Sequence, residues 1–126
     1  MTELSRNDPL AAVSPLDGRY AGRTAPLVPY ASESALMRAR VRVEAEYLDA
    51  LAALDATGLS LTEAEREALH ASYEDFDADD ADLIKRLETE GAAGYAATNH
   101  DVKAVEYFLR VHLSEISAIE DAERLF

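Results

Sequence analysis

The sequence predicts an all-α fold, a small helical domain of about four helices that follows an N-terminal loop. Apolar residues recur at the 3.6-residue spacing of a helix over residues 33–56 and again over 102–116. Between these segments, Thr62 and the last aspartates of the acidic run 73–82 precede shorter apolar repeats, as helix N-caps do. Three of the four prolines lie within residues 14–30, which favours an ordered loop there.

The length and composition limit the possible functions. A chain of 126 residues is long enough for one domain with its own apolar core. It contains no cysteine, which excludes disulfides, thiolate metal sites and a cysteine nucleophile. No apolar run reaches the length of a membrane span, and the N-terminus is too polar for a secretory signal. We therefore expect a cytoplasmic protein with no membrane partner.

The charge balance is strongly acidic, with 25 Asp and Glu against 12 Lys and Arg, a formal net charge of −13. Nucleic acid is disfavoured as a partner because a phosphate backbone needs a basic surface. Two explanations of the acidity stay open. One is a solvated surface that keeps the protein soluble. The other is adaptation to high salt, which the presence of only two lysines also favours.

The first long helix is predicted to begin after Ser32 as its N-cap and to run to about Ala56, with Gly58 as its stop. Arg40 and Glu44 fall inside its apolar arc, one turn apart, and predict an ion pair within the helix. The alternative is that they brace a neighbouring loop or a subunit contact. The expected core face has a main stripe and a flanking one: Leu36, Val43, Tyr47, Leu51 and Leu54, then Met37, Val41 and Leu48.

Two shorter helices follow. Thr62 and Glu65 form a capping-box pattern, so a second helix is expected to about Ser72. His70 on this helix is expected at the surface, because no second metal-binding residue lies at helical spacing from it. The acidic run 73–82 lacks the glycine and the late glutamate of a calcium loop, so its last aspartates are predicted to cap a third helix ending near Gly91.

The stretch Thr-Asn-His-Asp-Val-Lys-Ala-Val-Glu-Tyr-Phe at residues 98–108 is predicted to start the fourth helix. Thr98, Asn99 and Asp101 can each accept hydrogen bonds from the first turn. Such polar residues are either plain caps or the seat of an anionic ligand at the positive end of the helix.

The fourth helix is apolar most of the way round, which predicts a place in the middle of a bundle. Glu106 and Arg110 are expected to pair in its polar sector, with Lys103 beside them. His112 is expected to be packed and hydrogen-bonded. The predicted buried face consists of Val102, Val105, Leu109, Leu113 and Ile116.

Two separated motifs carry a resemblance to a known family. Residues 98–108, together with Ser-Pro-Leu-Asp-Gly-Arg-Tyr at 14–20, resemble the N-terminal part of adenylosuccinate lyases, in the fumarase/aspartase superfamily. Residues 39–44 on the first long helix are also similar to this family, and the resemblance covers about residues 13–113. It implies a lyase N-terminal helical domain at 13–126, truncated before the central helical bundle. Residues 1–12 show no apolar periodicity, which predicts a flexible terminus.

The resemblance also implies an activity. Adenylosuccinate lyases eliminate fumarate from adenylosuccinate to give AMP, and from a succinylated aminoimidazole carboxamide ribotide in purine biosynthesis. They need no cofactor or metal, and the full-length enzyme is expected to be a homotetramer. By resemblance, Arg19 and Tyr20 contact the purine nucleotide, with Arg19 on a charged oxygen, and Asn99, His100 and Asp101 line the same pocket. Asp101 is also expected to orient His100.

The catalytic motifs of the family are absent from this sequence. Neither the Thr-His motif of its general acid nor the Gly-Ser-Ser-x-Met-Pro-x-Lys loop of its general base occurs here. We therefore expect no catalytic residue in this segment, and a chain that binds nucleotide without turning over substrate. The alternative is a non-catalytic helical fragment or interaction module that keeps the motifs only structurally. A related lyase for another succinyl compound is disfavoured by the close match of both motifs.

Overall fold

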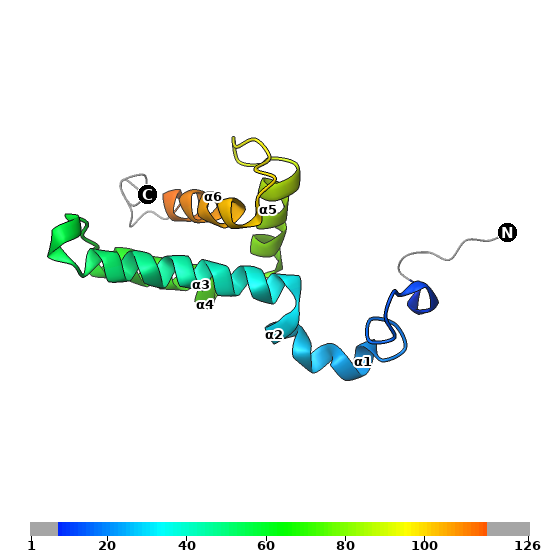
Figure 1. Ribbon diagram of the computed structural model, residues 1–126. Coiled ribbons are helices and arrows are strands. Elements are labelled where there is room, and N and C mark those ends of the chain that lie inside the picture. The colour runs from blue at the N-terminus through cyan, green and yellow to red at the C-terminus, as the bar shows by residue number, and fades with distance from the viewer. Residues whose placement is uncertain (1–7, 116–126) are drawn as a thin grey trace. The chain divides into compact units, whose positions relative to one another are not determined.

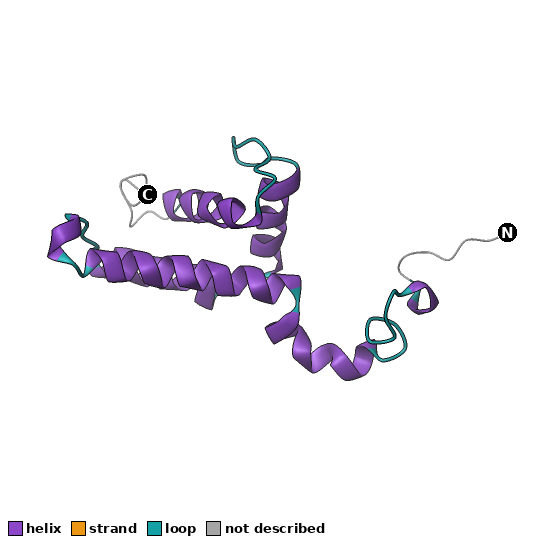
Figure 2. Cartoon of the chain, viewed as in Figure 1, coloured by secondary structure: helices purple, strands orange, loops and turns teal. Residues whose placement is uncertain are grey.

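The computed structural model describes residues 8–115. Every named secondary-structure element in that range is a helix (Figures 1 and 2). The predicted all-α class is therefore confirmed. The chain divides into two compact units, residues 1–35 and 36–126, which are described separately below. The expected flexible segment 1–12 lies mostly outside the described residues, so its boundary stays a prediction.

Residues 8–32 of the first unit contain four short helical elements. They are the 3₁₀ helix η1 (Pro9–Ala11), α1 (Ala21–Thr24), the 3₁₀ helix η2 (Ala25–Leu27) and α2 (Val28–Ala31). The prediction of a loop throughout 14–30 is wrong for its second half. Its prolines lie in the first turns of η2 and α2. Proline is tolerated there, because a first-turn N–H has no partner within the helix.

The long helix α3 (Glu33–Ala52) begins as predicted, since the Ser32 hydroxyl accepts a first-turn backbone N–H at 3.1 Å. It ends earlier than predicted. Leu54 is extended, and a separate 3₁₀ turn, η3 (Asp55–Thr57), precedes Gly58. Gly58 has a φ of +68°, a left-handed conformation that glycine adopts without strain.

The buried face of α3 differs from the predicted one. The flanking residues Met37, Val41 and Leu48 are buried, together with Ala45. Most of the predicted main stripe is exposed, with Val43 at 66% and Tyr47 at 62%. The prediction was wrong because α3 is apolar on two sides, and neighbouring helices decide which side is covered.

Helix α4 (Glu63–Glu74) pairs with α3 in an antiparallel hairpin held by polar contacts. Asp49 of α3 binds both Arg66 and His70 of α4, with 3.0 Å between Asp49 Oδ2 and His70 Nε2. The Tyr73 hydroxyl donates to Glu46 at 2.8 Å. The predicted capping box of Thr62 is present. His70 is half-buried in this ion pair, rather than a free surface residue.

Helices α5 (Ala78–Thr89) and α6 (Asp101–Ser114) pack against each other (Figure 1). Asp77 caps α5 in a capping box with Asp80, which confirms the prediction for the acidic run. Four helices contribute to one apolar core. Its buried residues are Met37, Val41, Ala45, Leu48, Leu69, Tyr73, Ile84, Leu87, Ala104, Val105, Phe108, Leu109 and Leu113.

Val105, Leu109 and Leu113 of the predicted α6 face are buried as predicted, and Ala104 and Phe108 are buried beside them. Phe108 is fully buried, whereas Val102 is 43% exposed and Ile116 lies outside the described residues. The predicted polar sector is confirmed, because Glu106 accepts from Arg110 at 3.0 Å and from Lys103 at 2.6 Å.

His112 stacks on Phe108, with 5.4 Å between ring centroids. Among the described residues it makes no hydrogen bond, contrary to expectation.

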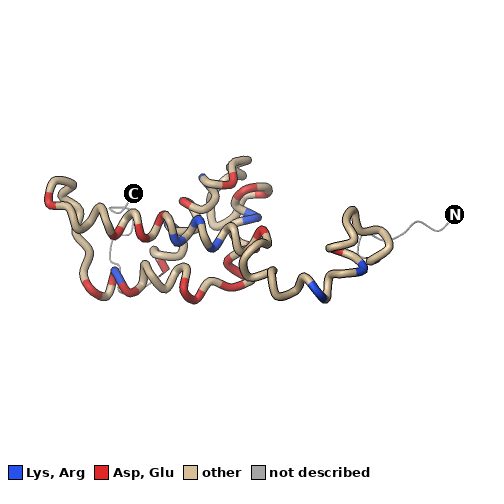
Figure 3. Tube along the Cα trace, turned by 60° about the horizontal axis from the view of Figure 1, so that its bottom comes forward, with Lys and Arg blue, Asp and Glu red and all other residues tan. Residues whose placement is uncertain are grey.

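Acidic residues occur on each of the helices α3 to α6 (Figure 3). Whether they reflect adaptation to high salt stays a prediction. In the part of the chain that the structure describes, no helix is both long and apolar enough to cross a membrane.

Truncating Phe108 tests the proposed centre of the core. Phe108 packs edge-on against Phe76 with 6.0 Å between centroids, so Phe108→Ala leaves a cavity and removes ring contacts. We expect a loss of about 3–5 kcal/mol in the free energy of unfolding. Urea denaturation followed by circular dichroism measures it. Val43→Ala, on the exposed side of α3, is the control, with a change below about 0.5 kcal/mol. Equal losses in both variants contradict this core.

Candidate functional site

The loop before α6 is attached to the end of α5 by backbone hydrogen bonds. The Thr98 N–H donates to the Leu87 carbonyl at 3.0 Å, and the Asn99 N–H donates to the Glu88 carbonyl at 2.8 Å. Asn99 has a φ of +49°, a left-handed conformation that asparagine tolerates better than most residues. This bend places His100 directly before the helix.

His100 is the N-cap of α6, although Thr98, Asn99 and Asp101 were the predicted caps. Its Nδ1 accepts the backbone N–H of Lys103 at 3.2 Å. Thr98 supports the cap indirectly, since its hydroxyl accepts the His100 N–H at 3.2 Å. Because Nδ1 is an acceptor, the neutral imidazole carries its proton on Nε2. No described residue binds Nε2, so this N–H remains available as a donor.

Asp101 is bound on both carboxylate oxygens. Oδ1 accepts the Val102 N–H at 2.9 Å, and Oδ2 lies 2.8 Å from Arg40 Nη2 on α3. The backbone hydrogen bond from Val102 is the main cause that lowers the pKa of Asp101, and Arg40 adds to it. Arg40 therefore pairs with Asp101 at the start of α6 rather than with Glu44, so the predicted pair within α3 is wrong, and of the alternative only the part of Arg40 is found.

The expectation that Asp101 orients His100 is wrong. Nδ1 of His100 lies 4.0 Å from Asp101 Oδ1, beyond hydrogen-bond distance. That nitrogen is already an acceptor for the backbone of α6, so it has no proton to offer a carboxylate. The helix itself, rather than Asp101, fixes the ring nitrogen.

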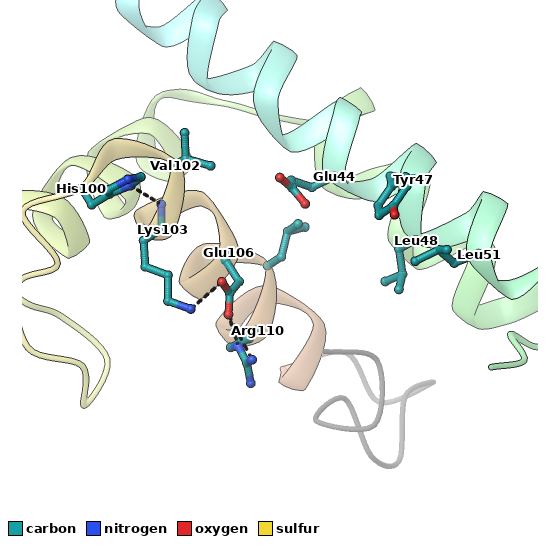
Figure 4. Close-up of a pocket in the computed structure, with 10 residues that line it drawn as sticks. Glu44, Tyr47, Leu48, Leu51, His100, Val102, Lys103, Glu106 and Arg110 are labelled. Carbon is teal, nitrogen blue, oxygen red and sulfur yellow. Dashed lines mark hydrogen bonds and ion pairs between the residues drawn. The ribbon is translucent and has the colours of Figure 1, made fainter. Parts of the chain in front are cut away.

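A groove of about 610 Å³ lies between α3 and α6 (Figure 4). The two helices run parallel, because Arg40 in the first half of α3 meets Asp101 at the start of α6, while Leu51 and Arg110 line the groove nearer both helix ends. The apolar part of the lining comes from Tyr47, Leu48, Leu51, Val102 and Leu109, and the polar part from Glu44, His100, Lys103, Glu106 and Arg110.

Sequence reasoning did not place Tyr47 and Glu44 at a site. The one signal in the sequence is the charge of Glu44 inside an apolar arc, which by itself favours an ion pair with Arg40. Glu44 makes no ion pair with any described residue. In residues 8–115, no three histidine, aspartate or glutamate side chains gather as a metal site would require.

Arg19 and Tyr20 belong to the first unit. The turn before them is closed by the Tyr20 N–H, which donates to the Pro15 carbonyl at 2.9 Å. A Cβ at Gly18 would lie 2.4 Å from the Pro9 carbonyl oxygen, so the turn requires glycine. The exposed guanidinium of Arg19 lies over the Tyr20 ring, 5.4 Å from its centroid. Asn99, His100 and Asp101 lie together in the second unit, and a pocket shared with Arg19 and Tyr20 stays a prediction.

Comparison with known proteins bears on the identity of these motifs. No protein-family model matches the chain. The chain is 41% identical over 104 residues to an adenylosuccinate lyase of Dictyostelium discoideum, 80% of this chain and 21% of that protein. It is 40% identical over 108 residues to an adenylosuccinate lyase of Legionella pneumophila (strain Corby). That match covers 84% of this chain and 22% of that protein. The resemblance to adenylosuccinate lyase is confirmed.

The similarity covers most of this chain but only a small part of each relative. The adenylosuccinate lyase of Escherichia coli K12 is also 41% identical, over 118 residues that cover 85% of this chain and 22% of that protein. The chain thus spans about a fifth of the length of the adenylosuccinate lyases it matches.

The polar wall of the groove predicts a pH-dependent contribution to stability. Burial opposes ionisation of Glu106, but hydrogen bonds from Lys103 and Arg110 outweigh it and lower its pKa below the ordinary 4.5. The stabilisation is therefore present above the unfolded value and is lost as the pH falls through the folded value. Near neutral pH, we expect Glu106→Gln to lose about 0.5 kcal/mol of unfolding free energy, since the pairs are partly solvated.

Urea denaturation of both proteins at neutral and acidic pH measures this effect. The difference between wild type and Glu106→Gln should vanish once the pH is well below the folded pKa. Glu88→Gln, which removes one pair with Lys85 at 3.0 Å, is the control. A difference between wild type and Glu106→Gln that persists or grows in acid contradicts the assignment.

Proposed function

We propose that this chain is the N-terminal part of an adenylosuccinate lyase and supplies nucleotide-binding residues to an active site completed elsewhere. The identity of about 40% over most of the chain supports the proposal. The whole enzyme would eliminate fumarate from adenylosuccinate to leave AMP, and act likewise on the succinylated carboxamide ribotide. A homotetrameric assembly and a cytoplasmic location belong to the same proposal.

The observation that carries the proposal is the free Nε2–H of His100. The residue is fixed as the cap of α6, it lines the groove, and its second ring nitrogen has no described partner. A donor held in this way suits a carboxylate or phosphate oxygen, as elimination of fumarate from a nucleotide requires. Arg19 and Tyr20 would also contact the nucleotide, because an exposed guanidinium binds such oxygens in two-point fashion.

Asn99 and Asp101 take different parts in this proposal. The exposed Asn99 side chain would hydrogen-bond the nucleotide beside His100. Asp101 is occupied by Arg40 and Val102. It would therefore line the site while holding the start of α6.

A second function class is favoured by another observation. Thr98, His100 and Asp101 all make hydrogen bonds or ion pairs within the chain that stabilise the start of α6. A non-catalytic helical module could keep the motif for these contacts alone. The two proposals differ in whether Nε2 of His100 has a ligand.

His100→Asn separates the two proposals. Asparagine is a good N-cap, so the variant keeps the helix start but lacks the imidazole donor. We expect its unfolding free energy to stay within about 0.5 kcal/mol of wild type. AMP affinity, measured by isothermal titration calorimetry on the 126-residue chain, should fall at least about tenfold, as loss of a charge-assisted hydrogen bond predicts. Unchanged affinity in His100→Asn favours the structural module.

A matched pair of arginine variants tests the first motif. Arg19 and Arg23 both lie over the Tyr20 ring, at 5.4 and 5.7 Å from its centroid. Arg19→Ala should weaken AMP binding about tenfold, whereas Arg23→Ala should not. Equal effects of the two variants would mean that charge alone, rather than a specific contact, attracts the nucleotide.

The isolated chain should not turn over substrate. The acid and base motifs that the resemblance implies are absent from the sequence. We expect no release of fumarate from adenylosuccinate above the rate in buffer, by an enzyme-coupled fumarate assay. Sustained turnover at a rate proportional to chain concentration would show that residues 1–126 contain a complete active site.

A further inference from the structure

The bridge between Arg40 and Asp101 links two elements that both line the groove. Arg40 lies on α3, and its side chain is 30% exposed. Glu44 lies one helical turn further along α3 and is unpaired among the described residues. The guanidinium of Arg40 nevertheless pairs with Asp101 on α6 and not with Glu44. The contact therefore fixes α3 relative to the start of α6, at the end of the groove where His100 lies.

The start of α6 is consequently held from two directions. Backbone hydrogen bonds from Thr98 and Asn99 attach the loop to α5. The Asp101 carboxylate joins the first turn of α6 to Arg40 on α3. His100 lies between these two attachments, and its ring is oriented by the Lys103 N–H.

From this geometry we propose that Arg40 is a positioning residue: through Asp101 it holds the start of α6 so that Nε2 of His100 faces the groove in one orientation. The inference rests on the proposed function only for its ligand, a purine nucleotide. Arg40 itself touches no ligand in this proposal. Without it, Asp101 loses its partner on α3, and the loop with His100 keeps its contacts to α5 and to the first turn of α6 but none to α3.

The experiment compares Arg40→Gln and Arg40→Lys with wild type. ¹⁵N NMR of the imidazole reports which nitrogen of His100 carries the proton, and AMP titration reports affinity. In Arg40→Gln we expect averaged His100 ring signals in place of the Nε2–H tautomer, and AMP binding weaker by about tenfold. Arg40→Lys keeps the positive charge and should partly recover the wild-type His100 ring signals and the AMP affinity. Arg86→Gln, which breaks an exposed pair with Asp82 at 3.0 Å, is the control.

A double-mutant cycle shows whether Arg40 acts through His100. In the His100→Asn background, Arg40→Gln should cause no further loss of AMP affinity, since coupled residues are not additive. A full additional loss means that Arg40 contacts the nucleotide directly, and it overturns the inference. Wild-type ring signals in Arg40→Gln also overturn it.

The two proposals can fail separately. If wild type binds no AMP, the proposed function fails for this chain, while the His100 ring signals in Arg40→Gln still decide the positioning role. If AMP binds and depends on His100 but not on Arg40, only the positioning role is lost.

Discussion

The carboxylate of Asp101 makes two contacts at the start of α6. It accepts the Val102 N–H in the first turn, and it pairs with Arg40 on α3. A carboxylate at this position is favourable twice over, because it faces the positive end of a helix and an arginine. The helix behind it is fixed by burial of Phe108 and its apolar neighbours. A rigid helix with a clamped first turn is the kind of support that a binding residue needs.

His100 shows how one residue can be structural and still available to a ligand. An imidazole has two nitrogens, and the cap uses only Nδ1. A serine or aspartate cap would serve the helix equally well but would leave no N–H donor directed away from it. The use of histidine at this position is therefore consistent with a role beyond capping.

Local patterns made much of the fold predictable. The capping boxes of Thr62 and Asp77 depend on residues three apart, so they can be read directly from the sequence. The buried side of α3 could not be predicted, since its choice depends on helices remote in sequence. A nucleotide-binding role for His100 stays a prediction from family resemblance. The groove wall formed by Tyr47 could not be predicted, because it requires the packing of α3 beside α6.

The partner of Arg40 illustrates why an energetically reasonable local prediction can fail. A pair one turn apart on an exposed helix contributes only about 0.3–0.5 kcal/mol, part of which is offset by ordering two flexible side chains. Asp101 is already restrained by the Val102 N–H, so pairing with it orders one side chain instead of two. It also keeps a helix start attached to its neighbour, which a pair within α3 could not do. Pairing with the long-range partner Asp101 is therefore more stabilising than pairing with the nearer Glu44, although no local pattern in the sequence reveals it.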